Sequence, residues 1–256
     1  MASGKQARRL RRTPSASPPP VRAKGATRRA SPQVLAGAGI VLALAIVAIV
    51  LVVVLTGGGT SKPPTVTADL SSVRGIQQNG LVLGNPFAKV TLTEYVDTSC
   101  PICQGYVLHT FPTLSQQYVR TGKVKVEARL VAFVGASSSR GRDLVLAAAR
   151  QNKAWQLLEL LYQNQGNETE SWLTDDLARA IAAKIPGLNV DQLLRDADST
   201  DVLSQSVKLD HEMQVDGVNA TPTFLLTSPD GKRHLLGSGT AAPSAFAQQF
   251  DRALKS

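Results

Sequence analysis

The stretch Lys89–Gly105, KVTLTEYVDTSCPICQG, decides the fold, and it holds both cysteines of the 256-residue chain. Residues 89–96 are rich in β-branched side chains that nearly alternate between apolar and polar, which predicts a strand. Residues 101–118 carry apolar side chains at helical spacing, which predicts a helix. Cys100 and Cys103 therefore lie where a strand ends and the first turn of a helix begins.

Two thiols separated only by Pro101 and Ile102 can close a small disulfide within one helical turn. The unpaired N–H groups and the positive dipole end of that turn favour the thiolate of the first cysteine. The sequence thus predicts Cys100 as the nucleophile and Cys103 as the resolving thiol, with no cofactor. A zinc site needs about four nitrogen or sulfur ligands, whereas this chain offers one cysteine pair and three scattered histidines, so we expect no metal. A static structural disulfide is the other alternative, although a bridge over two residues constrains little chain.

Residues 34–55 form the most apolar segment, 22 residues without a charge. At about 1.5 Å per residue, a helix of this length crosses a hydrocarbon core of about 30 Å, so we predict a transmembrane helix. A cleaved signal peptide is the alternative, but residues 56–59 are a poor cleavage site and the preceding basic region is long. The arginine pairs near the N-terminus resemble a twin-arginine signal only superficially, because they lie far before the apolar run.

The charge of the chain is concentrated before this segment. Residues 1–33 hold nine Lys or Arg and no acid, which equals the formal net charge of +9, whereas the rest of the chain sums to zero. By the positive-inside rule the N-terminus is cytoplasmic and everything after residue 55 lies outside. A nucleic-acid-binding arm is the alternative use of such a tail, but anionic lipid headgroups explain the same residues next to a membrane span. We therefore expect a disordered cytoplasmic tail, a single-pass anchor in the cell membrane, and no nucleic-acid partner.

After a linker at 56–75, residues 76–256 have the pattern of one mixed α/β domain. The middle of this domain shows only helical spacing, without a strand pattern. The elements predicted there are a strand at 124–133, four or five helices within about 139–214, a hairpin of 223–226 with 233–236, and a terminal helix at 243–254.

These features resemble the DsbA-like thiol-disulfide oxidoreductases, in which a helical subdomain is inserted into a thioredoxin fold. The resemblance covers about residues 76–252 and rests on CPIC after a strand, together with GVNATPTFLL at 217–226. A Cys-x-x-Cys motif alone is weak, whereas its combination with a Thr-Pro pair before a later strand is specific. The expected fold is α/β, a thioredoxin-like fold with an inserted helical subdomain, preceded by a single transmembrane helix.

The resemblance also implies roles for residues outside the cysteine motif. Thr221-Pro222 is expected to be a cis-proline loop that faces the active-site cysteines and pairs its backbone with an extended substrate chain. Glu94 lies where the thioredoxin fold often keeps a buried acid, and it is also the one acid on an otherwise apolar strand face. Burial would raise its pKa and make it a proton acceptor for Cys103. The alternative is an exposed Glu94 paired with Arg129 or Lys125.

One position departs from the family pattern. The DsbA-type oxidants with the lowest nucleophile pKa have a histidine between the cysteines, whereas Ile102 carries no charge and donates no hydrogen bond from its side chain. We therefore expect the pKa of Cys100 to lie between those of thioredoxin, about 7, and DsbA, about 3.5.

The resemblance and the topology together predict an enzyme of the cell envelope that introduces disulfides into exported proteins with free cysteines. A quinone-linked membrane partner, which the family implies, would reoxidise it. A reductase or isomerase that uses the same residues is the first alternative. A non-enzymatic, anchored thioredoxin-fold binding module is the second.

Overall fold

The structure, a computed structural model, describes residues 64–255. The predicted tail at 1–33, the predicted span at 34–55 and the linker as far as residue 63 lie outside the described residues. Within residues 64–255, no helix is both long and apolar enough to cross a bilayer.

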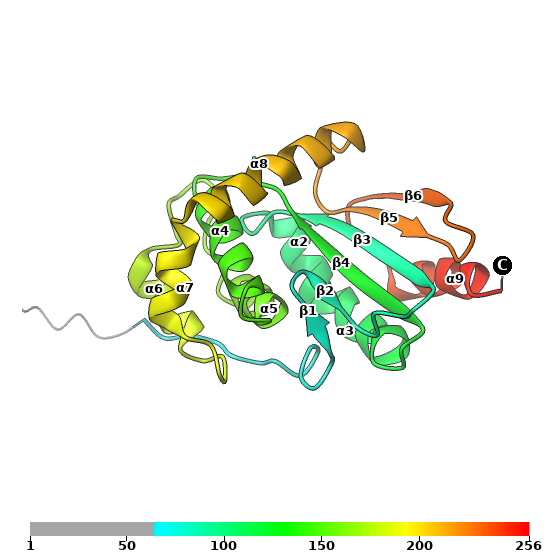
Figure 1. The fold of residues 1–256 in the computed structure, drawn as a ribbon, viewed down its shortest axis with the longest axis horizontal. Helices are drawn as coiled ribbons and strands as arrows, with labels where there is room; N and C mark the ends of the chain where they lie inside the picture. The colour runs from blue at the N-terminus through cyan, green and yellow to red at the C-terminus, as the bar shows by residue number, and fades with distance from the viewer. Residues whose placement is uncertain (1–63, 256) are drawn as a thin grey trace, which may run out of the picture. The chain divides into compact units, whose positions relative to one another are not determined.

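A six-stranded sheet runs through the described domain (Figure 1). Its strand order is β1-β2-β4-β3-β5-β6; β3 and β4 run parallel, and the other neighbouring pairs run antiparallel. The register places Glu94 between Ala128 on one neighbouring strand and Phe224 on the other. The strands are β1 (Gln78–Asn79), β2 (Val82–Leu83), β3 (Val90–Val96), β4 (Val124–Leu130), β5 (Thr223–Thr227) and β6 (Arg233–Ser238).

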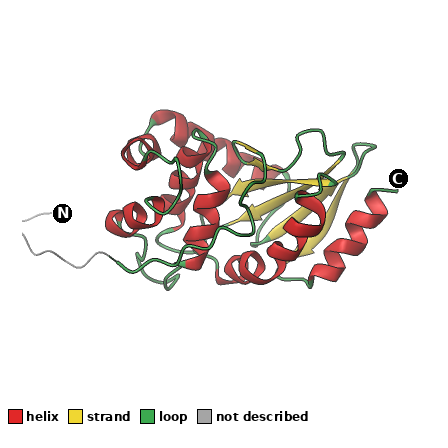
Figure 2. Cartoon of the chain, turned by 90° about the horizontal axis from the view of Figure 1, so that it is seen from below, coloured by secondary structure: helices red, strands yellow, loops and turns green. Residues whose placement is uncertain are grey.

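Helices pack against one face of this sheet, whereas much of the opposite face is open (Figure 2). Successive side chains of a strand point to opposite faces, so the adjacent Glu94 and Tyr95 side chains lie on opposite faces of the sheet. Glu94 accepts a hydrogen bond from Tyr106, which belongs to the helical segment after the cysteine motif. Tyr95 donates to Asp216, the residue that follows the last helix of the insertion. The strand that leads to Cys100 is therefore held from both sides.

The cysteine motif begins a continuous helical segment, as predicted, but the segment is not a uniform α-helix. It consists of α2 (Pro101–Gly105), a π-helical stretch η1 (Tyr106–Thr110), α3 (Phe111–Leu114) and a second π-helical stretch η2 (Ser115–Val119). Pro112 has no N–H to continue an α-helical ladder, and a widened turn directly before it avoids the clash that an α-helix would impose. The α-helical ladder thus gives way to a π-helical stretch just before Pro112.

The helical insertion is confirmed between β4 and β5. Thr174 and Asn189 cap two of its helices through side-chain oxygens that accept N–H groups of Leu177 and Gln192. The helices are α4 (Ser138–Ala149), α5 (Ala154–Gln163), α6 (Asp175–Ala182), α7 (Val190–Ala197), α8 (Thr200–Val215) and, after the hairpin, the terminal α9 (Pro243–Ala253).

Two expectations about strands need correction. The strand predicted at 124–133 ends at Leu130, because the N–H groups of Phe133 and Val134 turn away to bond the Asp97 carboxylate. The short strands β1 and β2 were missed, since two residues each are too few to show a periodic pattern.

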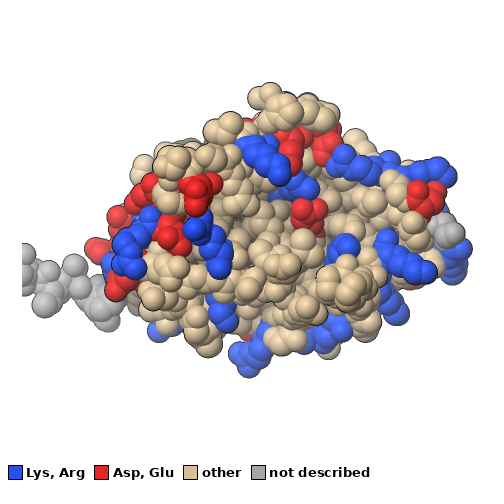
Figure 3. All heavy atoms as spheres, viewed as in Figure 1, with Lys and Arg blue, Asp and Glu red and all other residues tan. Residues whose placement is uncertain are grey.

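The surface carries both signs of charge. On the face shown in Figure 3, Lys and Arg side chains are interspersed with Asp and Glu side chains. This agrees with the balanced charge of the chain beyond residue 33.

Candidate active site

Cys100 is the N-cap residue of α2, and its sulfur lies between two backbone groups. The Cys103 N–H donates to Cys100 Sγ at 3.4 Å, and the Cys100 thiol donates to the Thr221 carbonyl at 3.3 Å. Both cysteines are free thiols in this structure. Cys100 is 4% exposed, whereas Cys103 is fully buried, so only the first cysteine has any surface that another molecule can reach.

The pKa values of the two thiols are shifted in opposite directions. A hydrogen bond from the Cys103 thiol lowers the pKa of Cys100 to about 6, with help from the N–H groups of Cys103 and Ile102, and against the effect of burial. Burial raises the pKa of Cys103 well above its usual value, and the neighbouring Cys100 raises it further. At neutral pH the pair therefore consists of one thiolate and one thiol, and the pKa of Cys100 lies in the interval expected from the sequence.

Glu94 lies inside the domain with no exposed surface. Its Oε2 accepts a hydrogen bond from the Tyr106 hydroxyl at 3.0 Å, and its Oε1 has no hydrogen-bond partner. Burial raises the pKa of Glu94 to about 8, and the nearby Glu159 carboxylate adds to this effect. The alternative of a surface ion pair is wrong, because Arg129 pairs with Glu127 and Glu212, and Lys125 bonds the Pro86 carbonyl.

The Thr221-Pro222 peptide bond is cis, as expected. Two hydrogen bonds hold this loop against the end of β6. The Gly239 N–H donates to the Pro222 carbonyl at 2.8 Å, and Thr223 Oγ1 and Ser238 Oγ lie 2.6 Å apart. These bonds present the Thr221 carbonyl to the Cys100 sulfur.

Pro101 and Ile102 occupy the turn between the cysteines. Pro101 is the first residue of α2, where its missing N–H removes no helical hydrogen bond. Ile102 is 49% exposed, so an apolar side chain marks the surface beside the reactive sulfur.

The sequence reasoning missed Asp97, which organises the loop before Cys100. Its Oδ1 accepts the Ser99 N–H at 2.8 Å and the Ser138 hydroxyl at 2.6 Å, and its Oδ2 accepts the N–H groups of Phe133 and Val134. The aspartate-to-backbone bond two residues ahead is an Asx turn, which the Asp-Thr-Ser sequence after a strand could have indicated.

Three residues of the helical insertion also contact this loop and were not assigned to the site from the sequence: Tyr162, Gln165 and Trp172. Local patterns carry no signal for these contacts, since each one joins residues more than sixty positions apart. Within the described residues, no group of three or more His, Cys, Asp or Glu side chains is arranged to hold a metal ion.

Comparison with known proteins identifies the fold family. Residues 77–233 match the sequence profile of a family described as Thioredoxin. The chain belongs to this thioredoxin family. A probable disulfide bond formation protein D from Bacillus cereus is 31% identical to it over 155 residues, which are 58% of this chain and 72% of that relative.

Solved structures agree with the family assignment. Oxidised BdbD from Bacillus subtilis matches with a TM-score of 0.61 and 22% identity, over 75% of this chain and 100% of that chain. The α-DsbA1 of Wolbachia pipientis matches with a TM-score of 0.56 and 20% identity, over 72% of this chain and 96% of that chain. This thioredoxin-family protein therefore has the DsbA-like fold with its helical insertion, and it is a thiol-disulfide oxidoreductase. Its family membership favours an enzyme over a non-enzymatic binding module.

Proposed function

We propose that this oxidoreductase introduces disulfides into exported proteins, with Cys100 as the sulfur that exchanges with substrate. The observation that carries the proposal is the stabilised Cys100 sulfur, which receives the Cys103 N–H at 3.4 Å and has a pKa lowered to about 6. A stabilised thiolate favours the reduced form of the enzyme, and an enzyme that prefers to be reduced oxidises its substrates. The name of the Bacillus cereus relative, a probable disulfide bond formation protein, supports this direction.

The reaction starts from the Cys100–Cys103 disulfide. A substrate thiolate attacks Cys100 Sγ, a mixed disulfide forms, and Cys103 leaves as a thiolate. Because the pKa of Cys103 is far above neutral, its sulfur takes up a proton. Glu94 is protonated at neutral pH with its pKa near 8, and it is the acid that we assign to this transfer.

The second half of the reaction releases the product. The second substrate thiolate attacks the substrate's own sulfur in the mixed disulfide, and Cys100 departs as a thiolate. Two electrons pass from the substrate dithiol to the enzyme, which ends as a dithiol. The low pKa of Cys100 makes it a good leaving group, so this step favours oxidised substrate.

The Thr221 carbonyl supplies the substrate contact that we propose. Next to Pro222, its backbone can pair with an extended chain and place a substrate cysteine against Cys100, in the manner of an added β-strand. Backbone pairing recognises the chain rather than particular side chains, so a broad range of exported substrates is expected.

The location belongs to the same proposal. We place the catalytic domain outside the cytoplasmic membrane, held by a single span at residues 34–55 with the basic tail in the cytoplasm, on the apolar and basic composition of these segments. A quinone-linked membrane partner would then reoxidise the dithiol through Cys103 and Cys100.

A trapping experiment tests both the nucleophile and the direction. Cys103→Ala in the full-length chain removes the resolving thiol, so exported proteins should accumulate as mixed disulfides on Cys100. Cys100→Ser is the matched control and should trap none. Alkylation of wild-type enzyme in cells should find mostly the disulfide form; a mostly reduced enzyme would instead favour the reductase or isomerase.

A further inference from the structure

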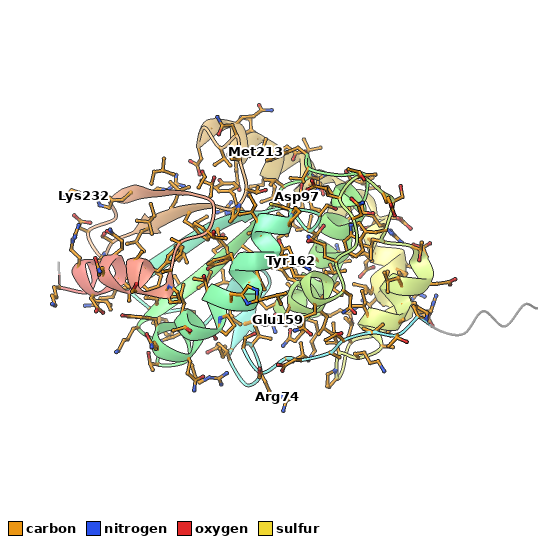
Figure 4. All side chains as sticks on the ribbon, turned by 180° about the vertical axis from the view of Figure 1, so that it is seen from behind. Arg74, Asp97, Glu159, Tyr162, Met213 and Lys232 are labelled. Atoms are coloured by element: carbon orange, nitrogen blue, oxygen red, sulfur yellow. The ribbon has the colours of Figure 1, made fainter. Side chains whose placement is uncertain are left out.

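The loop from Asp97 to Cys100 receives several hydrogen bonds from side chains of the helical insertion. Tyr162 donates its hydroxyl to the Asp97 carbonyl at 3.0 Å, and Trp172 Nε1 donates to Ser99 Oγ at 3.3 Å. Asp97 and Tyr162 are both marked in Figure 4, the first in the loop after β3 and the second on α5. These donors lie outside the thioredoxin core, so the insertion itself completes the active-site loop.

Gln165 makes the most direct of these contacts. Its side-chain amide donates to the Thr98 carbonyl at 2.7 Å and to the Cys100 carbonyl at 3.2 Å. The Cys100 carbonyl also accepts the Gln104 N–H at 3.0 Å, the bond that opens α2. One oxygen atom thus fixes the start of the helix and joins it to the insertion.

The contact between α2 and the insertion is reciprocal. Gln104 sends its own side-chain amide back to the Tyr162 carbonyl at 2.8 Å. Two glutamine side chains therefore cross the boundary in opposite directions, one from α2 and one from the segment just after α5. Such a pair resists both rotation and sliding of the Cys100 turn against the insertion.

The loop has little freedom to find other partners. Asp97, Thr98 and Ser99 are fully buried, so water does not replace a lost donor without a rearrangement. Without Gln165 the Thr98 carbonyl loses its donor, and a buried carbonyl without a donor costs about 1–3 kcal/mol in folded proteins, which would drive the loop to move.

We propose that Gln165, with the other donors of the insertion, is a positioning residue that holds the Cys100 sulfur against the Cys103 N–H. The inference rests on the proposed role of Cys100 as the exchanging sulfur. It adds that the insertion sets the strength of the oxidant through the turn it holds, without touching the sulfur.

Two substitutions separate the effect of the Gln165 hydrogen bonds from the effect of its side-chain shape. Gln165→Met keeps the length of the side chain and removes both donors, and Gln165→Glu keeps the shape and sets a carboxylate against two carbonyls. We measure the pH profile of Cys100 alkylation and the equilibrium with glutathione. Gln165→Met should raise the alkylation midpoint by roughly half to one pH unit, a threefold to tenfold loss of thiolate stabilisation, and Gln165→Glu should raise it further. Both should shift the glutathione equilibrium toward the disulfide form of the enzyme.

Asn164 provides the matched control. It also donates to two carbonyls, those of Thr67 at 2.8 Å and Leu160 at 2.7 Å, but it does not bond the active-site loop. Asn164→Leu removes those donors, and the Oδ1 that accepts the Thr67 N–H at 2.8 Å, at nearly constant shape; it should lose stability without moving the alkylation midpoint. An equal shift in Asn164→Leu, or an unchanged midpoint in folded Gln165→Met, would overturn the inference.

A second variant covers the case in which the Gln165 substitutions prevent folding. Trp172→Phe removes the bond to Ser99 and keeps an aromatic ring at this position, and it should raise the midpoint by a smaller amount; no shift in that variant would also overturn the inference. Failure of the proposed function would give a different result. Cys100 would then trap no substrate in the Cys103→Ala experiment, while the shifts of the alkylation midpoint in the Gln165 variants would remain measurable.

Discussion

Replacement of Glu94 by glutamine should stabilise the protein at neutral pH while it slows catalysis. The folded-state pKa of Glu94, about 8, lies above the ordinary value of 4.5 that applies to the unfolded chain. Below pH 4.5 both states hold the proton and Glu94 contributes no penalty. As the pH rises toward 8, the unfolded state releases the proton and the folded state does not, so stability is lost.

The size of the effect follows from the shift. At pH 7 the cost is about 3 kcal/mol, at 1.36 kcal/mol for each of the roughly 2.5 pH units above the unfolded pKa. Glutamine resembles the protonated acid in shape and does not titrate, so Glu94→Gln should match wild type near pH 4.5. It should exceed wild type by about 3 kcal/mol at pH 7 and by about 5 kcal/mol above pH 8. The Tyr106 hydroxyl keeps an acceptor in the variant.

Urea unfolding of the fully reduced protein between pH 4.5 and 8.5 measures this difference, and the rate of dithiol oxidation measures the catalytic loss. Glu170 is exposed, and Glu170→Gln makes the same chemical change in contact with water. If the stability difference between Glu94→Gln and wild type stays constant across this pH range, the assignment of a buried, protonated Glu94 is refuted.

Three further outcomes follow from the site. Alkylation of wild-type Cys100 should rise with a midpoint near pH 6, so that about 90% of the thiolate rate is present at pH 7; a midpoint above 8 contradicts the stabilised sulfur. Gly141→Ala should lower the melting temperature by roughly 5–10 °C, because the added Cβ would overlap Thr98 Oγ1 and lie 2.8 Å from Thr98 Cβ. Asp216→Asn weakens the bonds to Tyr95 and Arg233 that anchor the chain before the cis-proline loop, and it should raise KM for a peptide dithiol about threefold to fivefold with the alkylation midpoint unchanged.

The fold was predictable where one face of an element is apolar. The strand pattern of residues 89–96 and the helical spacing of apolar residues in 101–118 place the cysteines correctly at a strand-to-helix junction. Both patterns can be seen in the sequence because they arise from the alternation of buried and exposed neighbours. The end of β4 was not predictable, since the N–H of Phe133 bonds the Asp97 carboxylate, thirty-six positions earlier in the chain, instead of continuing the strand. The π-helical stretches were also hidden, because their spacing differs from that of an α-helix by one residue in a single turn.

The site divides in the same way. The motif and the lone acid on an apolar face point to Cys100, Cys103 and Glu94 from the sequence alone. The contacts of Gln165 could not be predicted, because a surface glutamine after a helix is ordinary and only the folded chain brings it to the Cys100 carbonyl. Sequence patterns thus locate the reactive atoms better than they locate the groups that support them.

The narrow exposure of the sulfur has a consequence for timing. With Cys100 4% exposed and Thr221 7% exposed, a client cysteine reaches the sulfur only on a segment that can stretch out and lie along the loop. Such segments are present in newly made polypeptides that have not yet folded. We therefore expect oxidation to precede the folding of each client, and the client's own compaction to end the encounter by withdrawing its cysteines.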